Sequence, residues 1–152
     1  MRPIRRVIFD TSTLVSAALR VGSVPHQALL TALCFCDVCA SAETLAEIEV
    51  VFNRRKFDRY LNLEERQAFI ANLHRSVRMF AVQNADIAEI ESSCRDSRDD
   101  QFLALAQTAE ADTVVSSDQD LLVLNPWRGV PIVTPAEFLA QLHGSLTQGR
   151  RI

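Results

Sequence analysis

Short apolar runs recur along the chain and are separated by longer stretches of mixed polarity. The runs fall at residues 7–9, 36–39, 113–115 and 131–133, and residues 77–82 give a fifth candidate. Short, mainly apolar runs of this length are typical of strands that are buried on both faces. The pattern therefore predicts a parallel sheet of four to five short strands.

The stretches between the strands carry apolar residues at helical spacing. Helices are expected at about residues 14–19, 25–33, 42–52, 62–74 and 102–106, and from residue 134 onward. Three start signals support them, namely Ser41 as an N-cap, Asn62 followed by Glu65, and Thr134 followed by Pro and Glu. Residues 87–100 indicate a turn or short helix and then a loop. The alternation favours an α/β fold with helices on both faces of the sheet.

A chain of 152 residues has the length of one ordinary domain. No internal repeat, linker or change of composition divides it. We expect one folded domain over residues 1–143 and a flexible C-terminal tail over residues 144–152.

The sequence shows no sign of export or of membrane insertion. No apolar run approaches the ~20 residues of a membrane-spanning helix, and MRPIRR leads directly into a strand without the apolar core of a signal peptide. The cysteines Cys34, Cys36, Cys39 and Cys94 do not have the spread of a disulfide scaffold or the second ligand pair of a zinc site. We therefore expect a cytoplasmic protein with free, buried thiols.

The formal net charge of -3 argues against nucleic-acid binding through a general positive field. Acids gathered around bound cations reverse the local field, however, and a modest basic rim is then enough to hold a polyanion. One basic group is present at the end of the 42–52 helix, formed by Arg54, Arg55, Lys56 and Arg59. This group could contact RNA or a partner protein. It could equally be solvated, because cations stabilise the C-terminus of a helix.

Four candidate acids lie after a predicted strand, before a predicted helix or off the apolar stripe of a helix. Asp10 and Asp118 follow two predicted strands, Glu47 lies off the apolar stripe of its helix, and Asp99 or Asp100 precedes another helix. The carboxyl ends of parallel strands share one edge of a sheet, and carboxylates that meet there repel one another unless a cation neutralises them. Mg²⁺ and Mn²⁺ prefer such oxygen ligands, and they promote hydrolysis by activating water.

Each of these acids has a structural explanation when taken alone. An aspartate after a strand is commonly a turn or cap residue, and a glutamate on a helix is commonly solvated. The combination of four such positions favours a metal-binding site. Asp120 is a reserve candidate beside Asp118, as Asp100 is beside Asp99.

Four segments carry a resemblance to a known family. They are VIFDTSTLVSAAL, ETLAEIEVVFNRRKF, DSRDDQFLALA and VVSSDQDLL, and together they extend over nearly the whole chain. In these segments and their order the chain resembles the PIN-domain family, which includes VapC-like toxins of bacterial toxin–antitoxin pairs. The resemblance implies a single PIN-like domain that cleaves RNA with Mg²⁺ or Mn²⁺.

The resemblance assigns a role to each acid. Asp10, Glu47, Asp99 and Asp118 would be the catalytic and metal-binding residues. The family spacing, counted back from the segment FLALA, favours Asp99 over Asp100 as the third acid.

The resemblance also implies supporting residues and partners. Ser12 and Ser116 stand where the family often has Asn and Thr, and they would orient the acids or a metal-bound water. The implied partners are an RNA substrate, a cognate antitoxin and a second copy of the chain, in a homodimer or higher homo-oligomer. A catalytically silent PIN-like domain that binds RNA or an antitoxin is the alternative. Four apolar residues of the 62–74 helix suit either the core or a groove for a helical inhibitor: Leu63, Phe69, Ile70 and Leu73.

Two other α/β families with clustered acids fit less well. A phosphatase of the haloacid dehalogenase type requires a second aspartate at the position of Ser12. A phospho-acceptor receiver domain requires a lysine after a late strand, whereas Lys56, the only lysine, lies near the middle of the chain.

Overall fold

A computed structural model describes residues 3–83 and 99–149, with side chains as far as residue 144. Its centre is a five-stranded sheet of β1 (Arg6–Phe9), β2 (Asp37–Ala40), β3 (Arg78–Met79), β4 (Thr113–Val115) and β5 (Ile132–Val133). All neighbouring strands are parallel. The predicted α/β fold around a parallel sheet is confirmed.

The chain builds this sheet outward from β1 in two directions. The strand order is β3-β2-β1-β4-β5, so that β2 and β3 lie on one side of β1 and β4 and β5 on the other. In such a sheet a crevice opens beyond the carboxyl ends of the two strands at which the direction changes. Here these strands are β1 and β4, and Phe9 pairs with Val115. The residues that follow them, Asp10 and Ser116, therefore emerge side by side.

Helices fill the connections between the strands. In the described ranges they are α1 (Thr11–Leu19), α2 (Val24–Phe35), α3 (Ala42–Phe52), the 3-10 turn η1 (Arg55–Phe57), α4 (Leu63–Ser76), α6 (Asp100–Ala109), α7 (Gln119–Leu122) and α8 (Pro135–Gly149). The three predicted caps are present. Each cap accepts the N–H of the third residue of its helix: Ser41 Oγ in α3 at 3.2 Å, Asn62 Oδ1 in α4 at 2.8 Å, and Thr134 Oγ1 in α8 at 3.2 Å.

Some boundaries differ from the prediction. Helix α1 begins three residues earlier than expected because the preceding aspartate caps it. Strand β3 is shorter than the predicted 77–82, and α7 was not predicted because four residues are too few to show a period. Helix α8 continues to Gly149, past residue 144, where we expected a flexible tail to begin. The turn and loop expected at residues 87–98 lie outside the described residues.

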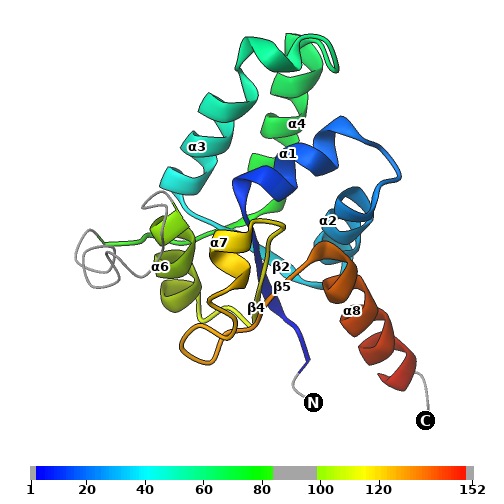
Figure 1. Cartoon of the computed structure of the whole chain (residues 1–152), viewed down its shortest axis with the longest axis vertical. Helices are drawn as coiled ribbons and strands as arrows, with labels where there is room; N and C mark the ends of the chain where they lie inside the picture. The colour runs from blue at the N-terminus through cyan, green and yellow to red at the C-terminus, as the bar shows by residue number, and fades with distance from the viewer. Residues whose placement is uncertain (1–2, 84–98, 150–152) are drawn as a thin grey trace.

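The strands divide the core into two layers. Val7 and Phe9 of β1 belong to a cluster with α1, α2, α3, α4 and α8, whereas Ile8 belongs to a cluster with α6 and α7. The same alternation holds for the other buried strands, as expected for side chains that point to opposite faces. Figure 1 shows α6 and α7 on one side of the strands and α2 and α8 on the other. Helices on both faces of the sheet are therefore confirmed.

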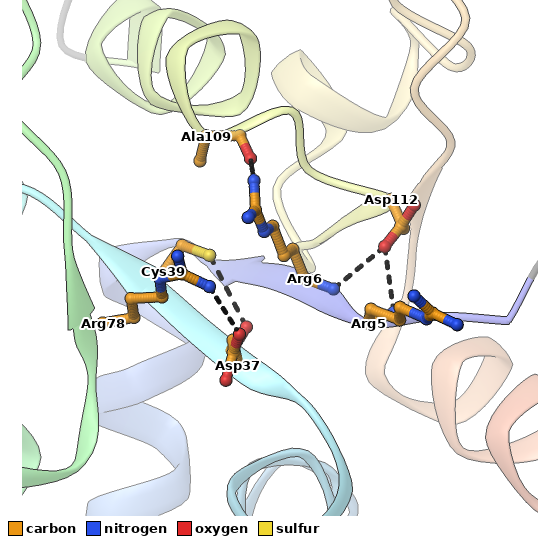
Figure 2. A network of polar contacts seen from close by, with 7 residues as sticks. All are labelled: Arg5, Arg6, Asp37, Cys39, Arg78, Ala109 and Asp112. Atoms are coloured by element: carbon orange, nitrogen blue, oxygen red, sulfur yellow. Dashed lines mark hydrogen bonds and ion pairs between the residues drawn. The ribbon is translucent and has the colours of Figure 1, made fainter.

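Polar contacts brace the amino edge of the sheet (Figure 2). Asp112 Oδ2 accepts hydrogen bonds from the backbone N–H groups of Arg5 and Arg6, each at 2.9 Å, and so joins the starts of β1 and β4. The guanidinium of Arg6 donates to the last carbonyl of α6 at 2.7 Å. Arg78 Nη1 and Asp37 Oδ2 form an ion pair of 3.0 Å between β3 and β2. These side chains stabilise the sheet at the edge opposite to the carboxyl ends of its strands.

Helices α3 and α4, with η1 between them, form an arm that projects beyond the carboxyl edge of the sheet (Figure 1). Arg66 of α4 is 1% exposed and holds the turn of this arm. It donates to the carbonyl oxygens of Phe52 at 2.7 Å and Arg54 at 3.2 Å, and it forms an ion pair with Asp58. The sequence analysis did not single out Arg66.

The apolar residues of α4 are divided between core and surface. Ile70 and Leu73 are buried in the core, and Phe69 packs partly against it. Leu63, by contrast, is 48% exposed. No helix in the described ranges is both long and apolar enough to cross a bilayer.

Three of the four cysteines lie in the described residues and are free thiols, as expected. Cys39 is buried and Cys36 half-buried, and burial raises the pKa of each to about 11. These two thiols are therefore protonated and unreactive at neutral pH. Cys34 is exposed, so the expectation that all thiols are buried was wrong for it. Cys94 lies outside the described residues.

Candidate active site

Asp10 ends the central strand and caps the first helix. Its Oδ1 accepts the backbone N–H of Thr13 at 2.9 Å and the hydroxyl of Ser12 at 3.3 Å. The residue is 3% exposed. The unpaired N–H groups of a helix N-terminus stabilise a negative charge. The local sequence Asp-Thr-Ser-Thr thus places a carboxylate at the switch point of the sheet and begins α1 there.

Ser116 connects Asp10 to the end of the neighbouring strand. Its fully buried hydroxyl donates to Asp10 Oδ2 and accepts the backbone N–H of Asp118 at 2.9 Å. The carboxylate of Asp118 in turn caps α7, where its Oδ1 accepts the N–H of Asp120 at 2.9 Å. The expected supporting serine and two predicted acids therefore meet at the switch point of the sheet, although 106 positions separate Ser116 from Asp10.

The environment of Asp10 disfavours its charge. Burial raises the pKa of the Asp10 carboxyl above its ordinary value of 3.8. Hydrogen bonds from Ser116 and Thr13 lower this pKa in part, and the negative charge of Asp118 raises it further. Two carboxylates that repel each other in a poorly solvated place are stabilised by a nearby cation.

Glu47 approaches the same region from α3. It is half-buried, and its Oε2 accepts a hydrogen bond of 2.5 Å from the hydroxyl of Thr11, the residue next to Asp10. Helices α1 and α3 are in contact. This bond brings a third predicted acid to the start of α1.

Asp99 and Asp100 lie together at the start of α6. They are 9% and 2% exposed, and α6 packs against β1, β2 and α3. Within residues 3–83 and 99–149, no three residues of the types His, Cys, Asp and Glu gather closely enough to hold one metal ion. The structure thus brings Asp10 and Asp118 together, and it does not gather all four predicted acids at one point.

The residues that do meet suit a hard divalent cation. Mg²⁺ is commonly bound by one or two carboxylates and keeps several waters. Asp10 and Asp118 provide such a pair, in which the charge of one raises the pKa of the other. Carboxylate and hydroxyl oxygens favour Mg²⁺ or Mn²⁺ over softer metals.

Thr11 and Thr13 belong to this site, although the sequence analysis did not single them out. Both are buried. The N–H of Thr13 could have been found, because an N-cap aspartate takes a hydrogen bond from the second or third residue of its helix. The bond from Thr11 to Glu47 spans 36 positions and leaves no local signal.

The remaining predicted residues lie at the margin of the site or away from it. Ser12 is exposed and Asp120 is half-buried beside Asp118. The basic group lies at the far end of the arm, described below.

The chain matches the family model described as PIN domain over residues 6–120, from β1 into α7. A comparison with curated proteins gives no match.

Three solved structures have a similar fold. PAE2754 from Pyrobaculum aerophilum is 11% identical with a TM-score of 0.65, and the likeness covers 92% of this chain and 90% of that one. VapBC2 from Rickettsia felis, in a structure bound to a DNA fragment from the VapBC2 promoter, is 12% identical with a TM-score of 0.60. The likeness covers 84% of this chain and 96% of that one. VapC20 from Mycobacterium tuberculosis, a sarcin-ricin loop cleaving toxin, is 16% identical with a TM-score of 0.54, covering 75% and 91%.

At such identities the structural likeness establishes the fold alone. The match to the family model adds evidence from the sequence that the chain is a PIN domain. It includes both strands of the switch point and the aspartates that follow them. The chain therefore belongs to the PIN-domain family.

Proposed function

We propose that this PIN domain is a metal-dependent ribonuclease that hydrolyses phosphodiester bonds in RNA. The observation that carries the proposal is the buried carboxylate of Asp10, bonded to Ser116 and close to Asp118 at the switch point of the sheet. Acids with a perturbed pKa in a crevice are candidates for catalysis. The PIN-domain match supports nuclease chemistry.

The proposed metal ligands are Asp10, Asp118, Glu47 and Asp99. Asp100 stays the reserve for Asp99, since both are buried at the same helix start. When bound, Mg²⁺ or Mn²⁺ supplies a water of lowered pKa and positive charge for the phosphoryl oxygens.

The neighbouring hydroxyl and amide groups fix the acids in one orientation. Ser116 and the N–H of Thr13 hold the two oxygens of Asp10, and Thr11 holds one oxygen of Glu47. Partners of this kind position ligands and commonly change metal affinity or activity by about 10- to 100-fold. We assign positioning roles to these three residues.

We further propose that the protein is the toxin of a toxin–antitoxin pair, with a cognate antitoxin and a second copy of itself as partners. The support is the likeness to VapC20, a toxin, and to VapBC2. Growth arrest on induction of the wild type in bacteria, absent for Asp10→Asn, tests this assignment.

The ribonuclease proposal is tested by incubating the purified protein with unstructured RNA and Mn²⁺ or Mg²⁺. We expect cleavage by the wild type, its loss on addition of a chelator, and rates for Asp10→Asn and Glu47→Gln that fall by more than the about 10- to 100-fold that loss of a positioning partner costs. Glu43→Gln is the matched control, since Glu43 is an exposed acid on the same helix as Glu47.

Equal cleavage by the wild type and Asp10→Asn would show that a contaminant cuts the RNA and would contradict the proposal. A wild type that binds RNA without cutting it would favour the catalytically silent alternative. One observation favours that alternative: among the described residues no three acids, histidines or cysteines gather closely enough to hold one metal ion together.

A further inference from the structure

Positive charge is concentrated at the tip of the arm. The segment between α3 and α4 contains four cationic residues and one acidic residue, although the formal net charge of the whole chain is -3. All four are exposed, and they are Arg54, Arg55, Lys56 and Arg59. With Tyr60 they form the surface that we call the arm tip. The next acids, Glu64 and Glu65, lie in the first turn of α4, where negative charge stabilises the helix.

The one acid at the arm tip already has a buried partner. Asp58 forms an ion pair with Arg66, whose guanidinium also donates to the carbonyl oxygens of Phe52 and Arg54. The ion pair of Arg78 with Asp37 lies elsewhere, at the amino edge of the sheet. The four cations are therefore presented to solvent on a turn that Arg66 holds in place.

An exposed aromatic ring lies among these cations. Tyr60 is 60% exposed, and the Arg59 guanidinium carbon lies 5.4 Å from its ring centroid. Surfaces that bind single-stranded nucleic acid combine cations, which meet phosphates, with aromatic rings on which bases stack. An acidic polypeptide could use the cations, but it has no base to stack on Tyr60.

The arm tip lies within reach of the candidate active site. Figure 1 shows the arm extending beyond the carboxyl edge of the sheet, where β1 ends and α1 begins. Asn53, the C-cap of α3, follows Glu47 by six residues, which corresponds to a rise of about 9 Å along a helix. That is about three stacked nucleotides at ~3.4 Å each. One RNA strand can therefore meet both the arm tip and the acids.

We propose that the arm tip binds single-stranded RNA a few nucleotides from the position of cleavage, through phosphate contacts with the four cations and base stacking on Tyr60. The inference rests on the proposed function for its substrate class. It concerns binding rather than cleavage, and it can be tested without activity.

The test measures binding of a labelled, unstructured RNA oligonucleotide by fluorescence anisotropy at several salt concentrations, in the Asp10→Asn background. Replacement of Arg55, Lys56 and Arg59 by Gln should weaken binding about tenfold or more and reduce the slope of log K against log salt by about 2. The matched control replaces three exposed arginines elsewhere by Gln: Arg5, Arg20 and Arg75. It should change the affinity less than the arm-tip triple does.

Two further variants separate charge from stacking and from folding. Tyr60→Ala should weaken RNA binding about fivefold or more, while the salt slope stays unchanged. Arg55→Lys with Arg59→Lys keeps the charge and should keep the salt slope. Thermal unfolding of each variant shows whether it is folded.

Equal losses for the arm-tip triple and the control triple would overturn the proposal. Polyglutamate serves as a probe for an acidic polypeptide. If the arm-tip triple loses binding to polyglutamate but keeps its affinity for RNA, the surface binds an acidic protein and the proposal is overturned. A wild type that binds RNA through the arm tip without cleaving it contradicts only the proposed function. Cleavage by the wild type, with RNA binding that does not depend on the arm tip, contradicts only this inference.

Discussion

Ser116 provides one hydroxyl to two partners, the buried carboxylate of Asp10 and the part-buried backbone N–H of Asp118. It donates to Asp10 Oδ2 and accepts the N–H of Asp118, and it is fully buried. Ser116→Ala would leave the buried carboxylate of Asp10 and the backbone N–H of Asp118 without this bond. A buried polar group that loses its partner costs about 1–3 kcal/mol. We expect the free energy of unfolding, measured in urea, to fall by about that amount.

Ser117→Ala is the control for this change, because Ser117 is adjacent and exposed. Exposed substitutions commonly alter stability by less than about 0.5 kcal/mol. If the two variants unfold at the same urea concentration, the hydroxyl of Ser116 does not carry the contact described here.

At the scale of elements, the arm depends on one buried arginine. Arg66→Met keeps the apolar part of the side chain but removes the donors to the carbonyl oxygens of Phe52, the last residue of α3, and of Arg54. Hydrogen bonds that involve a charged group contribute about 1.5–3 kcal/mol. Asp58 is 62% exposed, so its loss of a partner adds little. We expect a destabilisation of about 2–3 kcal/mol in urea unfolding.

Arg75→Met on the same helix is the comparison, since Arg75 is exposed and bonds only to Asn72 within α4 in the described structure. It should change stability by less than about 0.5 kcal/mol. A similar cost for both arginines would mean that burial of Arg66 does not fix the arm.

Elements with a local signal were predicted, and elements without one were not. The bounds of α3 follow from the cap at Ser41 and the apolar stripe of Leu45, Ile48 and Phe52. The single turn α7 and the two-residue β3 are too short for periodicity to detect.

At the scale of the whole molecule, Asp10 links stability to pH and to metal. A carboxyl whose pKa is raised in the folded state binds more protons there than in the unfolded chain. In metal-free protein, stability should therefore fall as pH rises from the ordinary value of 3.8 through the folded pKa. Asp10→Asn has no such loss and keeps a good N-cap, so it should melt at a higher temperature than the wild type at neutral pH.

When Mn²⁺ or Mg²⁺ is added, the wild type should instead melt at a higher temperature than Asp10→Asn. A ligand that binds only the folded state raises its stability in proportion to the logarithm of its concentration, about 2.7 kcal/mol at 100 times Kd. Only the wild type should gain this stability, because Asp10→Asn lacks a proposed metal ligand. Thermal unfolding of both proteins with chelator and with metal, from about pH 4 to 7, measures both effects. A metal-free Asp10→Asn that is less stable than the wild type at neutral pH would contradict this account of Asp10.

The sequence by itself determined the alternation of strands and helices, the capping residues and the positions of the acids after strands. These features depend on neighbours a few residues apart, so their signals are local. Only the tertiary structure decided that β4 returns to pair with β1, that Ser116 reaches Asp10, that Thr11 reaches Glu47, and that Arg66 closes the arm. Such contacts join residues that are 14 to 106 positions apart, and no periodicity along the chain records which loops close.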